Sequence, residues 1–119
     1  MVRDFDLIRN ILIEIENAPA SDRPIQQLSF DAQVDDATVS EHLELMIEAD
    51  LIDGKVISHN PAGFIIKRLT WLGHDFLEHA RNDTIWKKVI SQAKAKGSSV
   101  TLHVLNGLLT KAAEKYAGV

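Results

Sequence analysis

The sequence predicts a mainly α-helical protein with one small β-hairpin, on three observations. Apolar residues recur at three- and four-residue spacing along most of the chain, which is the period of amphipathic helices. Two runs rich in β-branched and apolar residues, 55–59 and 64–69, flank the turn sequence Asn60-Pro61-Ala62-Gly63. The 119 residues, 45% hydrophobic and 25% charged, have the composition of one globular domain with its own core.

The first helix is expected to begin at a cap formed by Asp4 or Asp6. It ends before Pro19, because residues 18–24 hold two prolines among small polar residues and cannot extend it. Its apolar stripe consists of Phe5, Leu7, Ile8, Ile11, Leu12 and Ile15. The segment 25–30, further on, has some strand character.

A second helix is expected between a cap at Asp35 or Asp36 and an end near Asp50. The residues that it places inward are Val39, Leu43, Met46 and Ile47. Leu51-Ile52 then returns the chain to the core, and the hairpin follows.

Three more helices follow the hairpin. Thr70 caps one that carries Trp71, Leu72, Phe76, Leu77 and Ala80. Asn82 or Asp83 opens the next, which Gly97 stops, and its apolar side consists of Ile85, Trp86, Val89, Ile90 and Ala93. Both tryptophans are predicted to lie in the core, because they stand at helical spacing beside other apolar residues.

The last helix is expected to begin at Ser98 or Ser99 and to pack lengthwise on another helix. Its apolar stripe is formed by Leu102, Leu105, Leu109, Ala112 and Tyr116. Two uses of this stripe stay open: it forms a homodimer interface, or it closes the protein's own core.

Three segments carry a resemblance to a known family. They are Arg3-Asp4 with Asp6-Leu7-Ile8-Arg9, Leu69-Thr70-Trp71-x-Gly73-His74-x-Phe76-Leu77, and Asp83-Thr84-Ile85-Trp86-Lys87-Lys88. With the final helix they span almost the whole chain. The sequence resembles a bacterial and prophage family known as domain of unknown function 2513, of winged helix-turn-helix type.

The resemblance implies a winged helix-turn-helix core over residues 1–81 and two additional C-terminal helices over 82–119, within one domain overall. The hairpin would be the wing, and the 35–50 helix would stand at the place of the recognition helix. Many winged-helix proteins have glycine after that helix, in a left-handed conformation, and this chain has Asp50 there. The resemblance brings no activity with it.

Charge is divided unevenly along the chain, and the division bears on its partners. Residues 1–54 have three arginines against thirteen acidic residues, a net charge of −10, whereas residues 55–119 have a net charge of +6. Residues 24–54 contain no Lys or Arg, so a recognition helix there would meet DNA phosphates with repulsion. DNA is therefore not favoured as the partner of this helix.

Two interpretations of the acidic helix stay open. In the first, its acids solvate the outer face and cap it. In the second, it faces a basic protein partner, or mimics nucleic acid, through Asp35, Asp36, Glu41, Glu44 and Glu48. If the protein binds DNA instead, as a winged-helix transcriptional regulator acting as a dimer, the candidate contacts are Lys55, Lys67, Arg68, Lys87 and Lys88.

No catalytic, metal-binding or cofactor-binding residue is predicted. The chain lacks cysteine, which excludes thiolate chemistry, and its five histidines fall in no convincing constellation, so structural roles are expected for them. No secretory signal or membrane span is recognised, so a cytoplasmic protein without a membrane partner is expected. The predicted function is that of a non-enzymatic regulatory or interaction protein with an unidentified protein partner.

Overall fold

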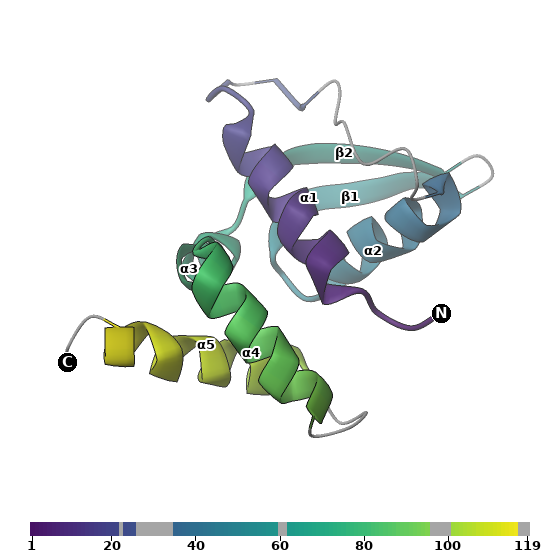
Figure 1. The fold of residues 1–119 in the computed structure, drawn as a ribbon. Helices are drawn as coiled ribbons and strands as arrows, with labels where there is room; N and C mark the ends of the chain where they lie inside the picture. The colour runs from purple at the N-terminus through teal and green to yellow at the C-terminus, as the bar shows by residue number, and fades with distance from the viewer. Residues whose placement is uncertain (22, 26–34, 60–61, 96–100, 117–119) are drawn as a thin grey trace. The chain divides into compact units, whose positions relative to one another are not determined.

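A computed structural model describes residues 1–21, 23–25, 35–59, 62–95 and 101–116. Its helices and strands are α1 (Phe5–Asn17), α2 (Asp36–Glu48), β1 (Ile52–His59), β2 (Ala62–Leu69), α3 (Trp71–Ala80), α4 (Asp83–Ala95) and α5 (Leu102–Tyr116) (Figure 1). The prediction of a mainly helical chain with one hairpin is confirmed, and the order of elements is consistent with a winged-helix-like arrangement followed by extra helices. None of the helices described is both long and apolar enough to cross a membrane.

The chain forms two compact units, residues 1–74 and 75–119. In the first unit, α1 packs against α2 and β2, and α2 packs against β1 (Figure 1). In the second unit, α4 packs against α5. The two units are described separately below.

Helix α1 is set by its cap and its apolar stripe. The Asp4 carboxylate accepts a hydrogen bond from the Leu7 N–H at 3.1 Å, which identifies Asp4 as the cap. The helix ends at Asn17, before Pro19, as predicted, and the next residue is extended. Its buried residues are Leu7, Ile8, Ile11, Leu12 and Ile15.

Helix α2 is fixed at both ends by local hydrogen bonds. The Asp35 carboxylate accepts from the Thr38 N–H at 2.7 Å and caps the start. At the other end Asp50 has φ 63°, and the Leu51 N–H donates to the Met46 carbonyl at 2.9 Å. This is a Schellman motif, in which the left-handed residue is usually glycine. Asp50, which was expected at the position where many winged-helix proteins have glycine, thus has the left-handed conformation.

His42 is the one fully buried polar side chain among the described residues. Its Nε2 accepts from the Asp4 N–H at 2.9 Å, and its Nδ1 lies 2.8 Å from the Thr38 carbonyl oxygen. Because the first partner only donates and the second only accepts, the ring is the neutral Nδ1–H tautomer. It joins α2 to the start of α1. Ile47, which was predicted to lie inward, is only half-buried.

The hairpin strands pair antiparallel, from Ile52 opposite Leu69 out to His59 opposite Ala62. They are longer than the predicted runs 55–59 and 64–69, and the register shifts twice along them. The Ile25 N–H donates to the Ile66 carbonyl at 2.8 Å, so the chain runs beside β2 at that point. The rest of the predicted strand 25–30 lies outside the described residues.

A compact junction joins the end of α2 to the start of α3. The Thr70 hydroxyl donates to the Asp50 carbonyl and accepts from the Gly73 N–H at 3.0 Å, which confirms Thr70 as the cap. The Thr70 N–H donates to the Leu51 carbonyl at 3.1 Å. A Cβ on Gly73 would lie 2.1 Å from that same oxygen, so no side chain fits there.

The prediction that Trp71 lies in the core is wrong. Trp71 is 84% exposed and Leu72 is 44% exposed. Each helical residue turns about 100°, so Trp71 lies about 140° away from Phe76, on the side opposite the buried residues of the helix. Trp86, by contrast, is buried and meets Phe76 edge to face with 6.4 Å between ring centres.

A polar side chain caps the start of each of the last two helices. The Asn82 amide oxygen accepts from the Ile85 N–H at 3.0 Å at the start of α4. The α5 helix begins at Leu102 rather than at Ser98 or Ser99, because Thr101 caps it by accepting from the Val104 N–H at 3.1 Å. The two serines and Gly97 lie outside the described residues.

Candidate functional site

The outer face of α2 carries a stripe of three carboxylates, Glu41, Glu44 and Glu48, which we call the acidic stripe. All three side chains are exposed, and none forms an ion pair with a residue that the structure describes. At helical spacing they stand opposite the buried face, which holds Val39, His42, Leu43 and Met46. The acidic stripe therefore has no part in the packing of the described residues of the first unit.

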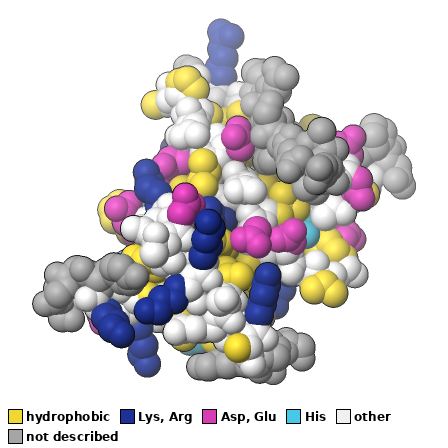
Figure 2. All heavy atoms as spheres, in the orientation of Figure 1, with side chains coloured by type: hydrophobic (Ala, Val, Ile, Leu, Met, Phe, Trp, Pro, Cys, Tyr) yellow, Lys and Arg dark blue, Asp and Glu magenta, His cyan; other side chains and the backbone are white. Residues whose placement is uncertain are grey.

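Asp35 and Asp36 extend the negative charge to the start of α2, and both are exposed. Magenta Asp and Glu side chains are visible at the right of Figure 2, where this helix begins. The hydrogen bond from the Thr38 backbone N–H lowers the pKa of the Asp35 carboxyl below its ordinary value, and a contact with the Thr38 side chain adds to this. Asp35 therefore stays charged to lower pH than a free carboxyl.

A hollow of about 560 Å³ opens where α2 ends, and we call it the Trp71 hollow. Its apolar lining comes from Ile47, Ile52 and Leu69, together with the exposed indole of Trp71. Its polar lining comes from Asp50, Asp53, Thr70, Arg68 and His74. A volume of this size is in the range that takes a side chain or a small ligand.

The charges at the Trp71 hollow are only partly paired. Arg68 and Asp53 form an ion pair at 3.6 Å between side chains that both reach solvent. The Asp50 carboxylate has no hydrogen-bond or ion-pair partner in the part of the chain that the structure describes. The hollow thus offers one uncompensated carboxylate beside an exposed aromatic ring.

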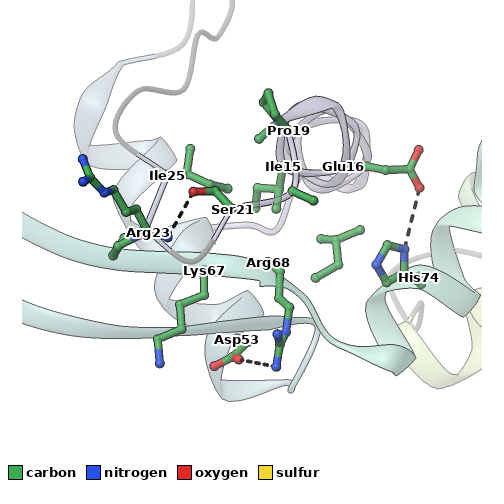
Figure 3. Close-up of a pocket in the computed structure, with 14 residues that line it drawn as sticks. Ile15, Glu16, Pro19, Ser21, Arg23, Ile25, Asp53, Lys67, Arg68 and His74 are labelled. Carbon is green, nitrogen blue, oxygen red and sulfur yellow. Dashed lines mark hydrogen bonds and ion pairs between the residues drawn. The ribbon is translucent and has the colours of Figure 1, made fainter.

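A second hollow, of about 640 Å³, adjoins it on the side of α1 and the loop after α1. Figure 3 shows Arg68 directed to Asp53 and His74 directed to Glu16, the latter pair 3.8 Å apart. Arg23 lies on the opposite side of the hollow from His74 in the same view. The cations around this hollow do not converge on one point, so it lacks the geometry of an anion-binding site.

The five basic residues considered for DNA contact are spread over three elements. Lys55 is on β1, Lys67 and Arg68 are on β2, and all three are exposed. Arg68 is engaged with Asp53. Lys87 and Lys88 are exposed on α4, in the second unit.

The leucine stripe of α5 is buried at its centre. Leu105 and Leu109 are both 0% exposed within the single chain, and Leu102 and Ala112 are half-buried. The side chain of Tyr116 lies outside what the structure describes. The burial of these two leucines within the single chain favours the second of the two uses of the stripe that the sequence left open.

The comparisons with known proteins place the chain in a family. Its residues 2–99 match the family described as hypothetical protein DUF2513. The chain belongs to this family. An uncharacterised protein from Haemophilus influenzae is 36% identical to the DUF2513 chain over 109 residues, which cover 88% of this chain and 89% of that protein. No solved structure matches the sequence.

The histidines of this DUF2513 protein lie on separate elements, His42 on α2, His59 on β1, His74 and His79 on α3 and His103 on α5. No group of three or more His, Asp or Glu side chains that could hold a metal ion occurs among the described residues. His42 is fully buried with both ring nitrogens bonded, and its neighbours in sequence did not reveal this burial. His74 lies beside Glu16 and lines both hollows.

Sequence reasoning missed Trp71 and Asp50 as a pair of site residues in the DUF2513 chain. The signal for Trp71 was its angular position on α3, opposite Phe76 and Leu77, which local apolar spacing alone obscured. Asp50 was noticed as a departure from glycine but not as a free carboxylate. That both line one hollow depends on the junction between α2 and α3, which the sequence does not display.

Proposed function

We propose that this DUF2513 protein is a non-enzymatic regulatory interaction protein whose α2 helix contacts a basic segment of a protein partner. The observation that carries the proposal is the acidic stripe. Its three carboxylates are exposed, unpaired among the described residues and opposite the buried face of α2. Complementary charge on a partner would steer its encounter with this face and fix its orientation.

The position of α2 supports its use as a contact element. The order of elements is consistent with a winged-helix-like arrangement, in which α2 would stand at the place of the recognition helix. Asp35 caps its start, the Schellman motif closes its end, and His42 joins it to α1. A helix held at these three points presents its outer face with little ordering cost on binding.

The same charges argue against DNA as the ligand of α2. A helix in the major groove approaches phosphates on both sides, and residues 24–54 bring no Lys or Arg to them. Asp35 and Asp36 stand at the end of the helix that usually leads into the groove. The electrostatic term, which supplies most non-specific DNA affinity, would be unfavourable here.

The second candidate function is that of a DNA-binding transcriptional regulator acting as a dimer. The observation that favours it is the winged-helix-like order of elements, with Lys55 and Lys67 exposed on the hairpin. In this alternative the hairpin and α4, rather than α2, would contact the phosphates. Binding to random duplex DNA at low and rising salt separates the two functions, because affinity that falls steeply with salt reports phosphate contacts.

The test uses a short peptide of alternating lysine and serine as the basic probe. In the stripe variant, Glu41, Glu44 and Glu48 are changed to Gln, which removes charge and keeps good helix formers. The control variant is Asp75→Asn with Glu78→Gln and Glu114→Gln, which removes three exposed acids of the second unit. Its net charge equals that of the stripe variant. The proposal is supported if the stripe variant binds the peptide more weakly than wild type and the control variant does not. Equal weakening of both variants, or about micromolar binding to random duplex DNA with a steep salt slope, contradicts it.

A further inference from the structure

We propose that the Trp71 hollow receives an arginine side chain of the partner's basic segment, with the guanidinium stacked on the Trp71 indole and paired with the Asp50 carboxylate. This inference rests on the proposed function and adds the chemistry of the side chain that is recognised. It assigns a site to the end of α2, beyond the acidic stripe on its outer face.

Trp71 is exposed where the fold does not need it. The residue is 84% exposed, whereas a tryptophan in a folded domain is on average largely buried. Its neighbours fix the start of α3 instead: Thr70 caps the helix, and Gly73 lies close against the Leu51 carbonyl. A large aromatic ring left at the edge of a hollow is the residue type that dominates binding energy at protein interfaces.

The Asp50 side chain is also not needed for the backbone conformation at the end of α2. With φ 63° it holds a conformation that glycine adopts without strain, and the capping bonds of the Schellman motif use only its backbone. Its carboxylate has no partner among the described residues. A non-glycine residue in the left-handed region costs stability, so the carboxylate is the feature that Asp50 brings to the hollow.

The chemistry of the hollow selects a cation on an aliphatic stem. Ile47, Ile52 and Leu69 line it with apolar surface against which methylene groups can pack. Asp53 is already paired with Arg68, which leaves Asp50 as the carboxylate without a counter-charge. A guanidinium is planar, stacks on aromatic faces and pairs with carboxylates through two parallel hydrogen bonds.

The rest of the partner segment is drawn by the surface next to the hollow. Ile47, which lines the hollow, and Glu48, which belongs to the acidic stripe, are consecutive residues of α2. A segment that places one arginine in the hollow therefore has its other cations within reach of exposed carboxylates. Charge complementarity thus extends continuously from the hollow onto the helix.

The experiment follows the Trp71 indole N–H by NMR while a peptide probe is titrated into the full chain. The probe is a short lysine-serine peptide with one central arginine, and its matched control has citrulline, the uncharged analogue, at that position. The chain has two tryptophans, so the indole signal that disappears in Trp71→Phe belongs to Trp71. The substitution is made at Trp71 because Trp86 is buried. We expect the arginine peptide to move the Trp71 signal and the citrulline peptide to bind about two- to fivefold more weakly.

Two variants test the two halves of the hollow. Trp71→Ala removes the ring, and Asp50→Asn removes the charge while keeping a residue type that tolerates the left-handed conformation. Each substitution is expected to weaken binding of the arginine peptide about two- to fivefold. Each variant should also bind the arginine and citrulline peptides equally well. The control Ile57→Ala, at an exposed apolar residue of the hairpin, is expected to bind as wild type.

The outcomes separate this inference from the proposed function. If the peptides bind, and binding depends on the acidic stripe but moves no Trp71 signal and ignores both hollow variants, the inference is wrong and the proposed function stands. If neither peptide binds wild type more tightly than it binds the stripe variant, both are wrong. A Trp71 shift with arginine alone, lost in Asp50→Asn, supports the inference.

Discussion

Gly73 lies against the carbonyl oxygen of Leu51 so closely that a Cβ at residue 73 would be 2.1 Å from it. The atom in the way is backbone, held by its hydrogen bond from the Thr70 N–H, so it cannot turn aside as a flexible side chain would. This contact sets where α3 begins relative to the end of α2, and it thereby shapes the Trp71 hollow.

We therefore expect Gly73→Ala to lower the free energy of unfolding by about 2 kcal/mol or more, the cost of forcing an atom into a packed backbone contact. Urea denaturation followed by circular dichroism measures it. Gly107→Ala is the matched control, because nothing lies within 4 Å of a Cβ there and residue 107 is inside α5. That change should raise stability by about 0.5–1 kcal/mol, as alanine does in helix interiors. Similar effects of the two substitutions would contradict the geometry of the junction.

The His42 ring is expected to be a strong determinant of stability. His42→Leu leaves the Asp4 N–H without its acceptor beside a fully buried position, at a cost of about 1 kcal/mol or more in the free energy of unfolding. Chemical denaturation measures the loss. His103→Leu, at an exposed position of α5, should change stability by less than about 0.5 kcal/mol. A His42→Leu protein as stable as wild type would show that the ring does not bridge α1 and α2.

The Asp35 cap gives a pH dependence of known sign. Because its pKa is lowered in the folded chain, its charge adds stability above the ordinary value of 3.8, and this contribution disappears as pH falls through the lower, folded value. Asp35→Asn keeps a cap acceptor without the charge. The stability difference between wild type and this variant should therefore shrink in urea titrations run from about pH 6 down toward pH 3. A difference that grows toward low pH would have the wrong sign.

The centre of the α5 stripe is expected to be core. Leu105 and Leu109 are fully buried in the single chain, so placing Lys at both positions should unfold α5 and lower the helical signal in circular dichroism. Light scattering on the same sample reports the oligomer. A folded, monomeric product obtained from a dimeric wild type would instead identify the stripe as a dimer interface.

The features that could be predicted from the sequence are those set by residues close to one another in the chain. Thr70 was predicted as a cap, and Asp4 and Asn82 were each one of two candidates, because a cap side chain bonds to a backbone N–H three residues on. The turn residues likewise located the hairpin, although the strands extend further than the β-rich runs. Periodicity similarly placed most of the apolar stripes.

Contacts between distant residues were beyond this reasoning. His42 acts on Asp4, 38 positions away, and nothing local marks it as buried. Trp71 was assigned to the core because it is aromatic and near apolar residues, whereas its angle on α3 turns it outward. The Trp71 hollow exists only because the end of α2, the strand end at Arg68 and the start of α3 come together. The acidic stripe was visible in advance because three residues of one helix define it.

Calorimetric titration of the lysine-serine peptide into wild type, the stripe variant and its charge-matched control at low salt decides whether α2 is the contact surface. We expect the loss of Glu41, Glu44 and Glu48 to weaken binding roughly tenfold, as the removal of three favourable exposed charge interactions would. We expect the Asp75, Glu78 and Glu114 control to bind within about twofold of wild type. Equal binding by the two variants would show that α2 is not the contact surface.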